Sequence, residues 1–532
     1  MEARNPSNGS LDWERSWAPH RLALPLLLAA AILAYQALPL YASREPDLAA
    51  FDDEEFVAYL DARIPGWMEE DGIPGASVLL IENSEVMWSG AYGYADLEAE
   101  RPLTTASLMM AHSISKSVTA WGVMRLVEEG RVGLDDPVEP YLEEHLGGWR
   151  FPASPFAAEG VTVRRLLSHS AGVPLGALGV EYGPREPIPT LTETLTGDEV
   201  RLVREPGEAF AYSNAGYALL ELLVEEVTGQ HFEDYMREEV LAPLGMTHST
   251  FAWREEMAAE VPTGYDLRGD PVYPYLYPYR ASGGLFTTLD DVGRFVLAGL
   301  APARGADHEV LLAPQSIEAM HTPQVPVPGL FGVVADGYGL GHFTETLPDG
   351  RSAVWHGGQG RGWMTHFHAV PTSGDGIVIL TNSQRSWPFF GRILSGWSRR
   401  QGFGPVGMSR IVLARPAMHV LIGWVLLAAL WIAWRVTQGI RTGSRRPTLR
   451  AGAAPGARIV AFIVAATLLG GLMWAENQEY LFISSIVPDD SIRFGAALLV
   501  LAIVLLAAAW LPVVDAPVSS TTIGPSIQRR ST

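Results

Sequence analysis

The segment Ser113-Ile114-Ser115-Lys116 contains the only lysine of a 532-residue chain whose other basic residues are all arginine. Residues 113–129 have the apolar pattern of a helix, on which positions three apart share one face. Ser113 thus stands at a helix start, where the positive end of the dipole favours developing negative charge. A buried lysine can accept the serine proton because burial lowers its pKa, whereas an arginine stays protonated. The segment predicts a serine nucleophile with Lys116 as its proton acceptor.

By chance, a lone lysine has a serine three residues before it in about one case in fifteen, so the first segment alone is weak evidence. Two further segments strengthen the interpretation. Tyr212-Ser213-Asn214 follows a Pro-Gly-Glu turn and precedes a predicted helix, and its Tyr and Asn can face one cleft. His356-Gly357-Gly358 follows a predicted strand, where glycines let a substrate approach the backbone. Taken singly, Tyr212 could be a half-buried core tyrosine and His356 a strand-end histidine.

Together and in this order, the three segments resemble the motifs of the β-lactamase-related serine hydrolases. This group contains class C β-lactamases, related penicillin-binding proteins, D-aminopeptidases and esterases. The resemblance covers roughly residues 50–400. It includes the stretches Leu166–Pro174, Pro206–Tyr217, Leu241–Met246, Ser282–Leu285 and Tyr338–Gly341. It implies an α/β (α+β) hydrolase fold, in which helices flank an antiparallel sheet and form an additional helical subdomain.

The resemblance also implies a role for each matching residue. Ser113 would be the acylated nucleophile, and Lys116 its proton acceptor or electrostatic activator. Tyr212 would be a second proton shuttle. Asn214 would orient the substrate and Lys116. The reaction would therefore need no cofactor.

The third motif departs from the pattern of the group at His356, which stands where relatives carry the lysine of K-T-G. A histidine titrates near neutrality, whereas that lysine is a permanent cation that helps to engage a substrate carboxylate. Gly358 matches the closing glycine of the motif, and the backbone amides of Gln359 and Ser113 would form the oxyanion hole. The missing cation favours an esterase or peptidase over a β-lactamase or a D-Ala-D-Ala carboxypeptidase.

Four apolar stretches without Asp, Glu, Lys or Arg are long enough to cross a bilayer as helices. They are residues 22–43, 416–434, 459–475 and 494–514. The loop 435–458 carries six arginines and no acid, so the positive-inside rule places it in the cytoplasm. This orientation predicts cytoplasmic tails at 1–21 and 515–532 and an exported hydrolase domain at 44–405. The first stretch could instead be a cleaved signal peptide.

The composition excludes several classes of protein. The chain has no cysteine, which rules out disulfides, thiolate metal sites and a cysteine nucleophile. Residues 44–415 hold 51 acids against 25 arginines and Lys116, a net charge of −25 that argues against nucleic acid as a partner. His366 and His368 alternate on a predicted strand as metal ligands do, but neither an acid nor a third histidine is expected nearby. The expected partners are a small-molecule, peptide or ester substrate and the lipid bilayer, with no metal; the oligomeric state stays open.

Strands are predicted at both ends of the exported block, around a helical middle. The predicted elements are a helix at 54–64 that Pro65-Gly66 ends, strands at 76–81 and 86–94, strands at 353–356, 364–370 and 376–380, and a closing helix at 389–399. This arrangement predicts one sheet that the two ends of the block complete. The sequence therefore predicts an exported, membrane-anchored serine hydrolase that forms an acyl-enzyme. The alternative of another class is a non-catalytic membrane sensor, because three C-terminal spans exceed what an anchor requires.

Overall fold

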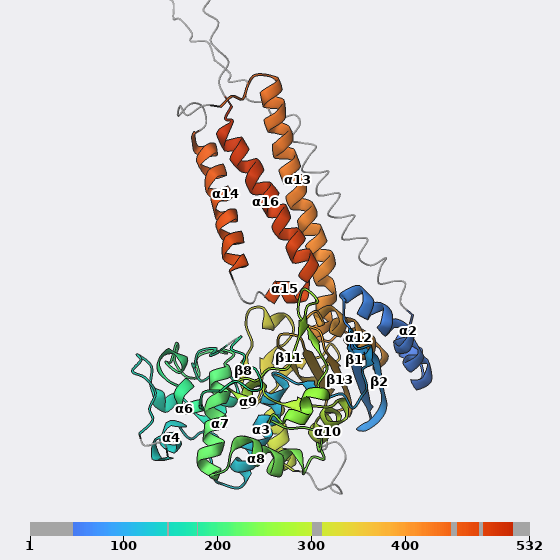
Figure 1. Cartoon of the computed structure of the whole chain (residues 1–532), viewed down its shortest axis with the longest axis vertical. Coiled ribbons are helices and arrows are strands. Elements are labelled where there is room, and N and C mark those ends of the chain that lie inside the picture. Colours follow the sequence, from blue (N-terminus) through green and yellow to red (C-terminus); the bar gives the residue numbers. More distant parts are fainter. Residues whose placement is uncertain are drawn as a thin grey trace, which may run out of the picture. The chain divides into compact units, whose positions relative to one another are not determined.

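The computed structural model describes residues 46–145, 148–177, 179–300, 311–447, 455–477 and 482–513. The chain divides into two compact units (Figure 1). One comprises Leu48–Arg415 with Gln478–Ser491, and the other comprises Met1–Asp47, Pro416–Asn477 and Ile492–Thr532. The predicted tails 1–21 and 515–532 and the predicted first span 22–43 lie outside the described residues.

A nine-stranded antiparallel sheet forms the centre of the first unit, in the order β3-β2-β1-β13-β12-β11-β10-β9-β8. Its strands are β1 Gly75–Glu82, β2 Glu85–Asp96, β3 Arg101–Pro102, β8 Val325–Pro326, β9 Gly337–Tyr338, β10 Phe343–Thr346, β11 Ser352–Gln359, β12 Met364–Val370 and β13 Asp375–Thr381. Strand β1 pairs with β13 from Ala76 opposite Thr381 to Ile81 opposite Gly376. The prediction of one sheet completed by both ends of the block is confirmed.

The hairpin of β1 and β2 turns at Asn83 and Ser84, whose φ angles are 50° and 62°. Two consecutive residues with positive φ make the type I′ turn, whose twist matches that of the flanking strands. The predicted hairpin is therefore confirmed, and its polar turn has a conformational reason. At the far end of β2, the Tyr265 hydroxyl accepts a hydrogen bond of 2.8 Å from the Leu97 amide.

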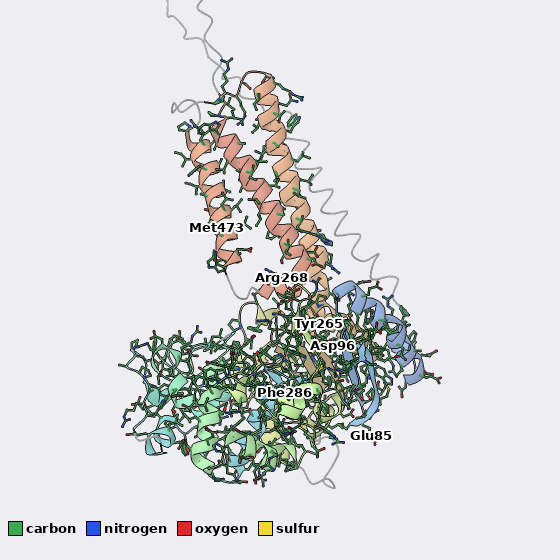
Figure 2. All side chains as sticks on the ribbon, viewed as in Figure 1. Glu85, Asp96, Tyr265, Arg268, Phe286 and Met473 are labelled. Atoms are coloured by element: carbon green, nitrogen blue, oxygen red, sulfur yellow. The ribbon has the colours of Figure 1, made fainter. Side chains whose placement is uncertain are left out.

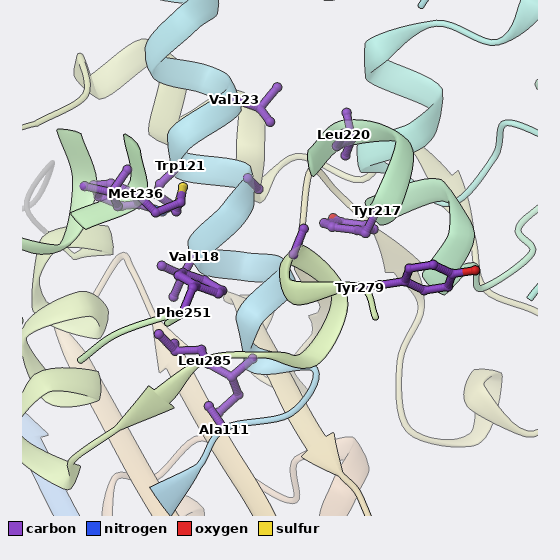
Figure 3. Packing of buried hydrophobic residues seen from close by; sticks show 14 of the residues in the cluster. Ala111, Val118, Trp121, Val123, Tyr217, Leu220, Met236, Phe251, Tyr279 and Leu285 are labelled. Atoms are coloured by element: carbon purple, nitrogen blue, oxygen red, sulfur yellow. The ribbon is translucent and has the colours of Figure 1, made fainter. Parts of the chain in front are cut away.

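Helices cover both faces of the sheet. Side chains alternate between the two faces along a strand, so the central strands contribute to two different cores. Leu79 and Leu380 belong to the core that contains α3 Ile114–Glu128, α7 Asn214–Thr228 and α10 Leu289–Gly299. Val78 and Ile379 belong to the core with α2 Asp53–Asp71 and α12 Trp387–Arg400. Figure 3 shows the first core, in which side chains of α3 and α7 pack together. The central helix α3 is buried along nearly its whole length.

The region between β3 and β8 forms the predicted helical subdomain. Besides α3, α7 and α10 it contains α4 Glu139–His145, α5 Val163–Leu167, α6 Leu191–Thr194, α8 Phe232–Met236, α9 Arg280–Gly283 and α11 Pro314–His321. Two small strand pairs also lie here, β4 Met109–Met110 with β7 Phe286–Thr287, and β5 Gly264–Tyr265 with β6 Pro271–Val272. The architecture is thus the expected antiparallel sheet with flanking helices and a helical insertion.

The first helix is longer than predicted. Helix α2 continues past Pro65 to Asp71 and ends at Gly72, which has a φ of 67°. A proline inside a helix removes one hydrogen bond and crowds the preceding turn. Trp67 and Met68 lie beyond the proline and are buried in the core, so their packing offsets that cost. The prediction that Pro65-Gly66 ends the helix is wrong for this reason.

Three described helices are long and apolar enough to cross a membrane. They are α13 Ala414–Arg441, α14 Pro455–Glu476 and α16 Pro488–Trp510, and a short α15 Phe482–Ile486 precedes the last. Large apolar side chains are exposed on them, such as Met473 of α14 at 70% (Figure 2). Helix α16 ends at Trp510, before the predicted limit of 514, because Pro512 cannot continue a helix.

Candidate active site

Ser113 occupies the N-cap of α3, immediately after a strained turn. His112 is buried with a φ of 49°, a conformation that side chains other than glycine rarely adopt. The Ser113 hydroxyl makes no capping hydrogen bond to the helix backbone. It is instead 3.2 Å from Lys116 Nζ, one turn further along α3. The local fold therefore directs the hydroxyl toward the lysine rather than toward the helix end.

The Lys116 side chain has no exposed surface. Its Nζ atom donates to the backbone oxygen of Ser282 at 2.6 Å. Both described hydrogen-bond partners of Nζ are neutral oxygens, and burial holds the pKa of Lys116 well below its usual range. A neutral amine can keep one N–H on Ser282 and turn its lone pair toward Ser113. This is the arrangement that a lysine base requires.

Ser282 lies on the short helix α9, which a carboxylate from α7 holds in place. The fully buried Glu221 accepts hydrogen bonds from the Ala281 amide at 2.8 Å and from Arg280 Nη1 at 3.3 Å. Burial raises the pKa of Glu221 to about 8. The sequence singled out the Ser282–Leu285 stretch but assigned it no role. Its contribution is a backbone carbonyl, which a side-chain motif does not reveal.

Tyr212 covers Lys116 from the other side. Lys116 Nζ lies 4.8 Å from the centroid of the Tyr212 ring. Burial raises the pKa of Tyr212, and a hydrogen bond with Ser113 opposes that shift. The next residue, Ser213, caps α7 by accepting from the Gly216 amide at 2.8 Å. The cap fixes the point at which the extended Tyr212 segment becomes helix.

His169 supports this segment, although the sequence assigned it no role. Its Nδ1 accepts a hydrogen bond of 3.1 Å from the Ser213 amide, and its ring centroid is 4.3 Å from that of Tyr212. His169 has a φ of 56° and is buried. Burial holds the pKa of His169 well below its usual range. It is therefore a neutral histidine that orders the Tyr212 turn.

Asn214 is the first residue of α7, next to Tyr212 and Ser213. Its side-chain amide donates to the Ala177 carbonyl at 3.4 Å. In the described contacts the oxygen that orients Lys116 is that of Ser282. Asn214 thus ties the loop at 175–177 to the catalytic segment, and its expected role toward Lys116 stays a prediction.

His356 lies on β11 and is almost completely buried. His356 Nδ1 is 2.9 Å from the carbonyl oxygen of the next residue, Gly357. His356 Nε2 is 3.1 Å from the Tyr338 hydroxyl. The carbonyl requires a proton on Nδ1, so Nε2 accepts from Tyr338. Burial, together with the nearby Lys116, holds the pKa of His356 well below neutrality. A histidine that titrates near neutrality was expected, but this one is neutral because water does not reach it.

Gly358 lets β11 approach the segment before the nucleophile. A Cβ atom on Gly358 would lie 2.0 Å from the Ala111 carbonyl oxygen and 2.3 Å from Thr365 Oγ1. Thr365 donates to that same carbonyl at 2.7 Å. The glycine is therefore a steric requirement, since it brings the end of the strand beside residues 111–113.

Gln359, the expected oxyanion residue, follows Gly358 at the end of β11. Its side-chain Oε1 accepts a hydrogen bond of 2.9 Å from Trp387 Nε1. Trp387 begins α12, on the other face of the sheet. This contact orders the residue whose backbone amide was assigned to the oxyanion hole, and sequence reasoning did not find Trp387.

His366 and His368 lie on the face of β12 that packs against α12, where their rings contact Phe390 and Trp397. The expectation that no acid lies near them is wrong, because Glu345 Oε1 is 3.1 Å from His368 Nε2. Glu345 is on β10, and only the pairing of β10, β11 and β12 brings it close. Among the described residues, no group of three His, Cys, Asp or Glu side chains could hold a metal ion.

Several known proteins are similar to this chain in sequence and in fold. Residues 60–393 match the Beta-lactamase family. Protein flp of Staphylococcus aureus (strain MRSA252) is 27% identical over 332 residues, which are 61% of this chain and 62% of that protein. The chain thus spans less than two thirds of that relative's length. Penicillin-binding protein 4* of Bacillus subtilis (strain 168) is 30% identical over 177 residues, 32% of this chain and 37% of that protein.

Two solved structures extend the comparison. The octameric penicillin-binding protein homologue from Pyrococcus abyssi is 31% identical with a TM-score of 0.56, over 66% of this chain and 78% of that chain. A class C β-lactamase is 21% identical with a TM-score of 0.52, over 63% of this chain and 93% of that chain, which supports the fold alone. With the sheet topology and the family match over 60–393, these comparisons show that the chain belongs to the Beta-lactamase family of serine hydrolases.

Proposed function

We propose that this protein is an exported, membrane-anchored serine hydrolase that forms an acyl-enzyme on Ser113. The observation that carries the proposal is the position of Lys116, fully buried with Nζ 3.2 Å from Ser113 Oγ. Burial lowers the lysine pKa, so a neutral amine is available to accept the serine proton. An arginine at this position would keep the charge but lack that capacity.

In the proposed reaction, Ser113 Oγ attacks the substrate carbonyl carbon while its proton passes to Lys116 Nζ. The backbone amides of Ser113 and Gln359 hold the resulting oxyanion. The intermediate then collapses, the bond to the leaving group breaks, and Tyr212 gives its proton to the leaving group and regains one from Lys116. A water molecule finally hydrolyses the acyl–Ser113 ester and releases the acid.

The substrates we propose are esters or peptides that carry no essential carboxylate, either small or derived from the cell envelope. His356 is neutral, so it supplies no cation for a substrate carboxylate. The net charge of −25 over residues 44–415 also disfavours the approach of anions. Both features favour an esterase or peptidase.

Two alternatives have their own support. The penicillin-binding relatives and the match to the Beta-lactamase family favour a β-lactamase or a D-Ala-D-Ala carboxypeptidase. The three apolar C-terminal helices favour a membrane sensor that binds its ligand without turnover. A panel of p-nitrophenyl esters, D-amino-acid amides and nitrocefin separates these cases. Turnover of the esters or amides supports our proposal, whereas nitrocefin turnover alone, or acylation without turnover, supports an alternative.

The proposed location places the hydrolase unit outside the cell membrane, because the arginine-rich loop 435–458 is assigned to the cytoplasm. The chain has no cysteine, so a single introduced cysteine reports its own side of the membrane. Tyr273 is 71% exposed, and Tyr273→Cys should react with an impermeant maleimide in intact cells. Ser444→Cys in the loop should react only after permeabilisation. The reverse pattern would contradict the proposed orientation.

A fluorophosphonate probe tests the nucleophile directly. The probe should label the wild type and the control Ser89→Ala, in which an exposed serine is removed. It should spare Ser113→Ala. Equal labelling of all three proteins would exclude Ser113 as the nucleophile.

A further inference from the structure

An exposed apolar segment flanks the predicted catalytic tyrosine. Leu330, Phe331 and Val333 form what we term the apolar ledge, with exposed fractions of 66%, 37% and 51%. The ledge lies between β8 and β9 and ends in the 3-10 turn η8 Phe331–Val333. Single exposed apolar residues are common on proteins, but a run of large ones marks a binding surface.

The inner side of the ledge is anchored against the active site. The Phe331 ring stacks on the Tyr212 ring, with centroids 6.1 Å apart and an interplanar angle of 19°. Phe331 also stacks on Phe343 of β10, with centroids 5.6 Å apart. The Tyr212 ring also lies against Lys116 Nζ. The ledge is therefore in contact with the predicted catalytic groups through Tyr212.

The outer side of the ledge is linked to the segment that precedes α13. Arg410 Nη1 donates a hydrogen bond of 2.6 Å to the Val333 carbonyl. Arg410 belongs to the turn η9 Gly407–Leu413, in which Val412 and Leu413 are also exposed, at 36% and 57%. Leu413 is followed directly by Ala414, the first residue of α13, which is apolar enough to cross a membrane. The ledge is therefore hydrogen-bonded to the chain segment that contains Val412 and Leu413.

We infer that the ledge binds the apolar chain of the leaving group, and that the substrates are esters of alcohols with an apolar chain. The inference rests on the proposed function, in which Tyr212 returns a proton to the departing oxygen. That oxygen must then lie against Tyr212, and the remainder of the leaving group extends toward the ledge. The ester bond breaks, the alkyl alcohol leaves with the proton from Tyr212, and water later releases the acid from Ser113.

The test varies the two sides of the ester separately, with the full chain in detergent. One series consists of acetate esters of alkanols from butanol to octanol, and the other of methyl esters with acyl chains of the same lengths. The ledge variant is Leu330→Asn with Val333→Thr. Its matched control is Leu97→Asn with Val86→Thr, which removes apolar residues of similar exposure, 48% and 49%.

The wild type and the control should turn over octyl acetate with a higher kcat/KM than butyl acetate. The ledge variant should lose about tenfold on octyl acetate, because a buried chain of several methylene groups contributes at least that factor. Its turnover of methyl acetate, whose leaving group has no chain to reach the ledge, should stay unchanged. Losses in the acyl series alone, or no loss in either series, would overturn the inference.

Two further outcomes separate this inference from other causes. Losses only with esters embedded in vesicles, at unchanged activity on dissolved esters, would make the ledge a membrane-docking surface and would also overturn it. Failure of the wild type to turn over any ester, with no probe on Ser113, would instead refute the proposed function. Normal methyl acetate turnover by the ledge variant would show that its active site is folded.

Discussion

Lys116 Nζ lies 2.6 Å from the backbone carbonyl oxygen of Ser282, inside the protein and away from solvent. The contact joins the only lysine of the chain to the short helix α9, 166 positions further along. It orients the amine while leaving its lone pair for Ser113.

Replacing the lysine should separate stability from activity. Lys116→Arg and Lys116→Met should each lower kcat/KM by about 10³ or more, because neither side chain accepts the serine proton. The unfolded chain binds the lysine proton below its ordinary pKa of 10.5, whereas burial lowers the pKa in the folded state. The lysine therefore lowers the free energy of unfolding as the pH falls below 10.5. At pH 7, Lys116→Met should have a higher melting temperature than the wild type. A lower melting temperature for Lys116→Met would contradict this account.

The pH dependence of catalysis should report Lys116 and not His356. As the pH rises through the lowered pKa of Lys116, the neutral amine forms and kcat/KM should rise to a plateau. The plateau should extend into the alkaline range, because burial raises the pKa of Tyr212. His356→Gln should lower the rate but keep the acid limb, since His356 is neutral throughout. If the acid limb shifts or disappears in His356→Gln, the titrating group is the histidine.

Adjacent glycines on β11 provide a matched pair of variants. In Gly358→Ala the new methyl group would overlap the Ala111 carbonyl at 2.0 Å, so the oxyanion site should open and kcat should fall about a hundredfold. In Gly357→Ala the nearest atom is 3.4 Å away, and activity should remain near that of the wild type. Thermal unfolding of both variants controls for folding. Equal losses would show that the close approach at Gly358 is not required.

Glu221 should make stability depend on pH. Its pKa is about 8 in the folded protein against an ordinary value of 4.5, so the folded state binds more protons between these values. The contribution of Glu221 to the free energy of unfolding is fully present below pH 4.5 and is lost as the pH rises through about 8. Glu221→Gln should therefore show a smaller drop in urea midpoint between pH 5 and pH 8 than the wild type. An unchanged drop would mean that other groups cause it.

The sequence predicted the parts of the fold that have a strong local pattern. The strands predicted at 76–81, 86–94, 364–370 and 376–380 match the central strands β1, β2, β12 and β13 closely. The outer strands β8, β9 and β10 have two to four residues, too few for a period to be visible. Pro65 predicts an end of helix α2 that the structure does not have, because the burial of the residues beyond the proline has no local signal in the sequence.

The candidate site shows the same division. Side-chain chemistry and spacing indicate Ser113 and Lys116, the family resemblance indicates Tyr212, and the structure brings the three together. Ser282 acts through its backbone, and Trp387 reaches Gln359 only because α12 packs beneath β11. Contacts of this kind depend on tertiary structure and have no local signature in the sequence. The position of Glu345 beside His368 was missed for the same reason.

The most direct test of the central claim is to trap the acyl-enzyme. The full-length protein is mixed with excess p-nitrophenyl acetate, quenched in acid within the first turnover, and digested for mass spectrometry. We predict a burst of about one p-nitrophenolate per protein and one acetyl group on the peptide that contains Ser113, with both signals absent in Ser113→Ala. Turnover without a burst, or an acetyl group on another residue that persists in Ser113→Ala, would contradict the account.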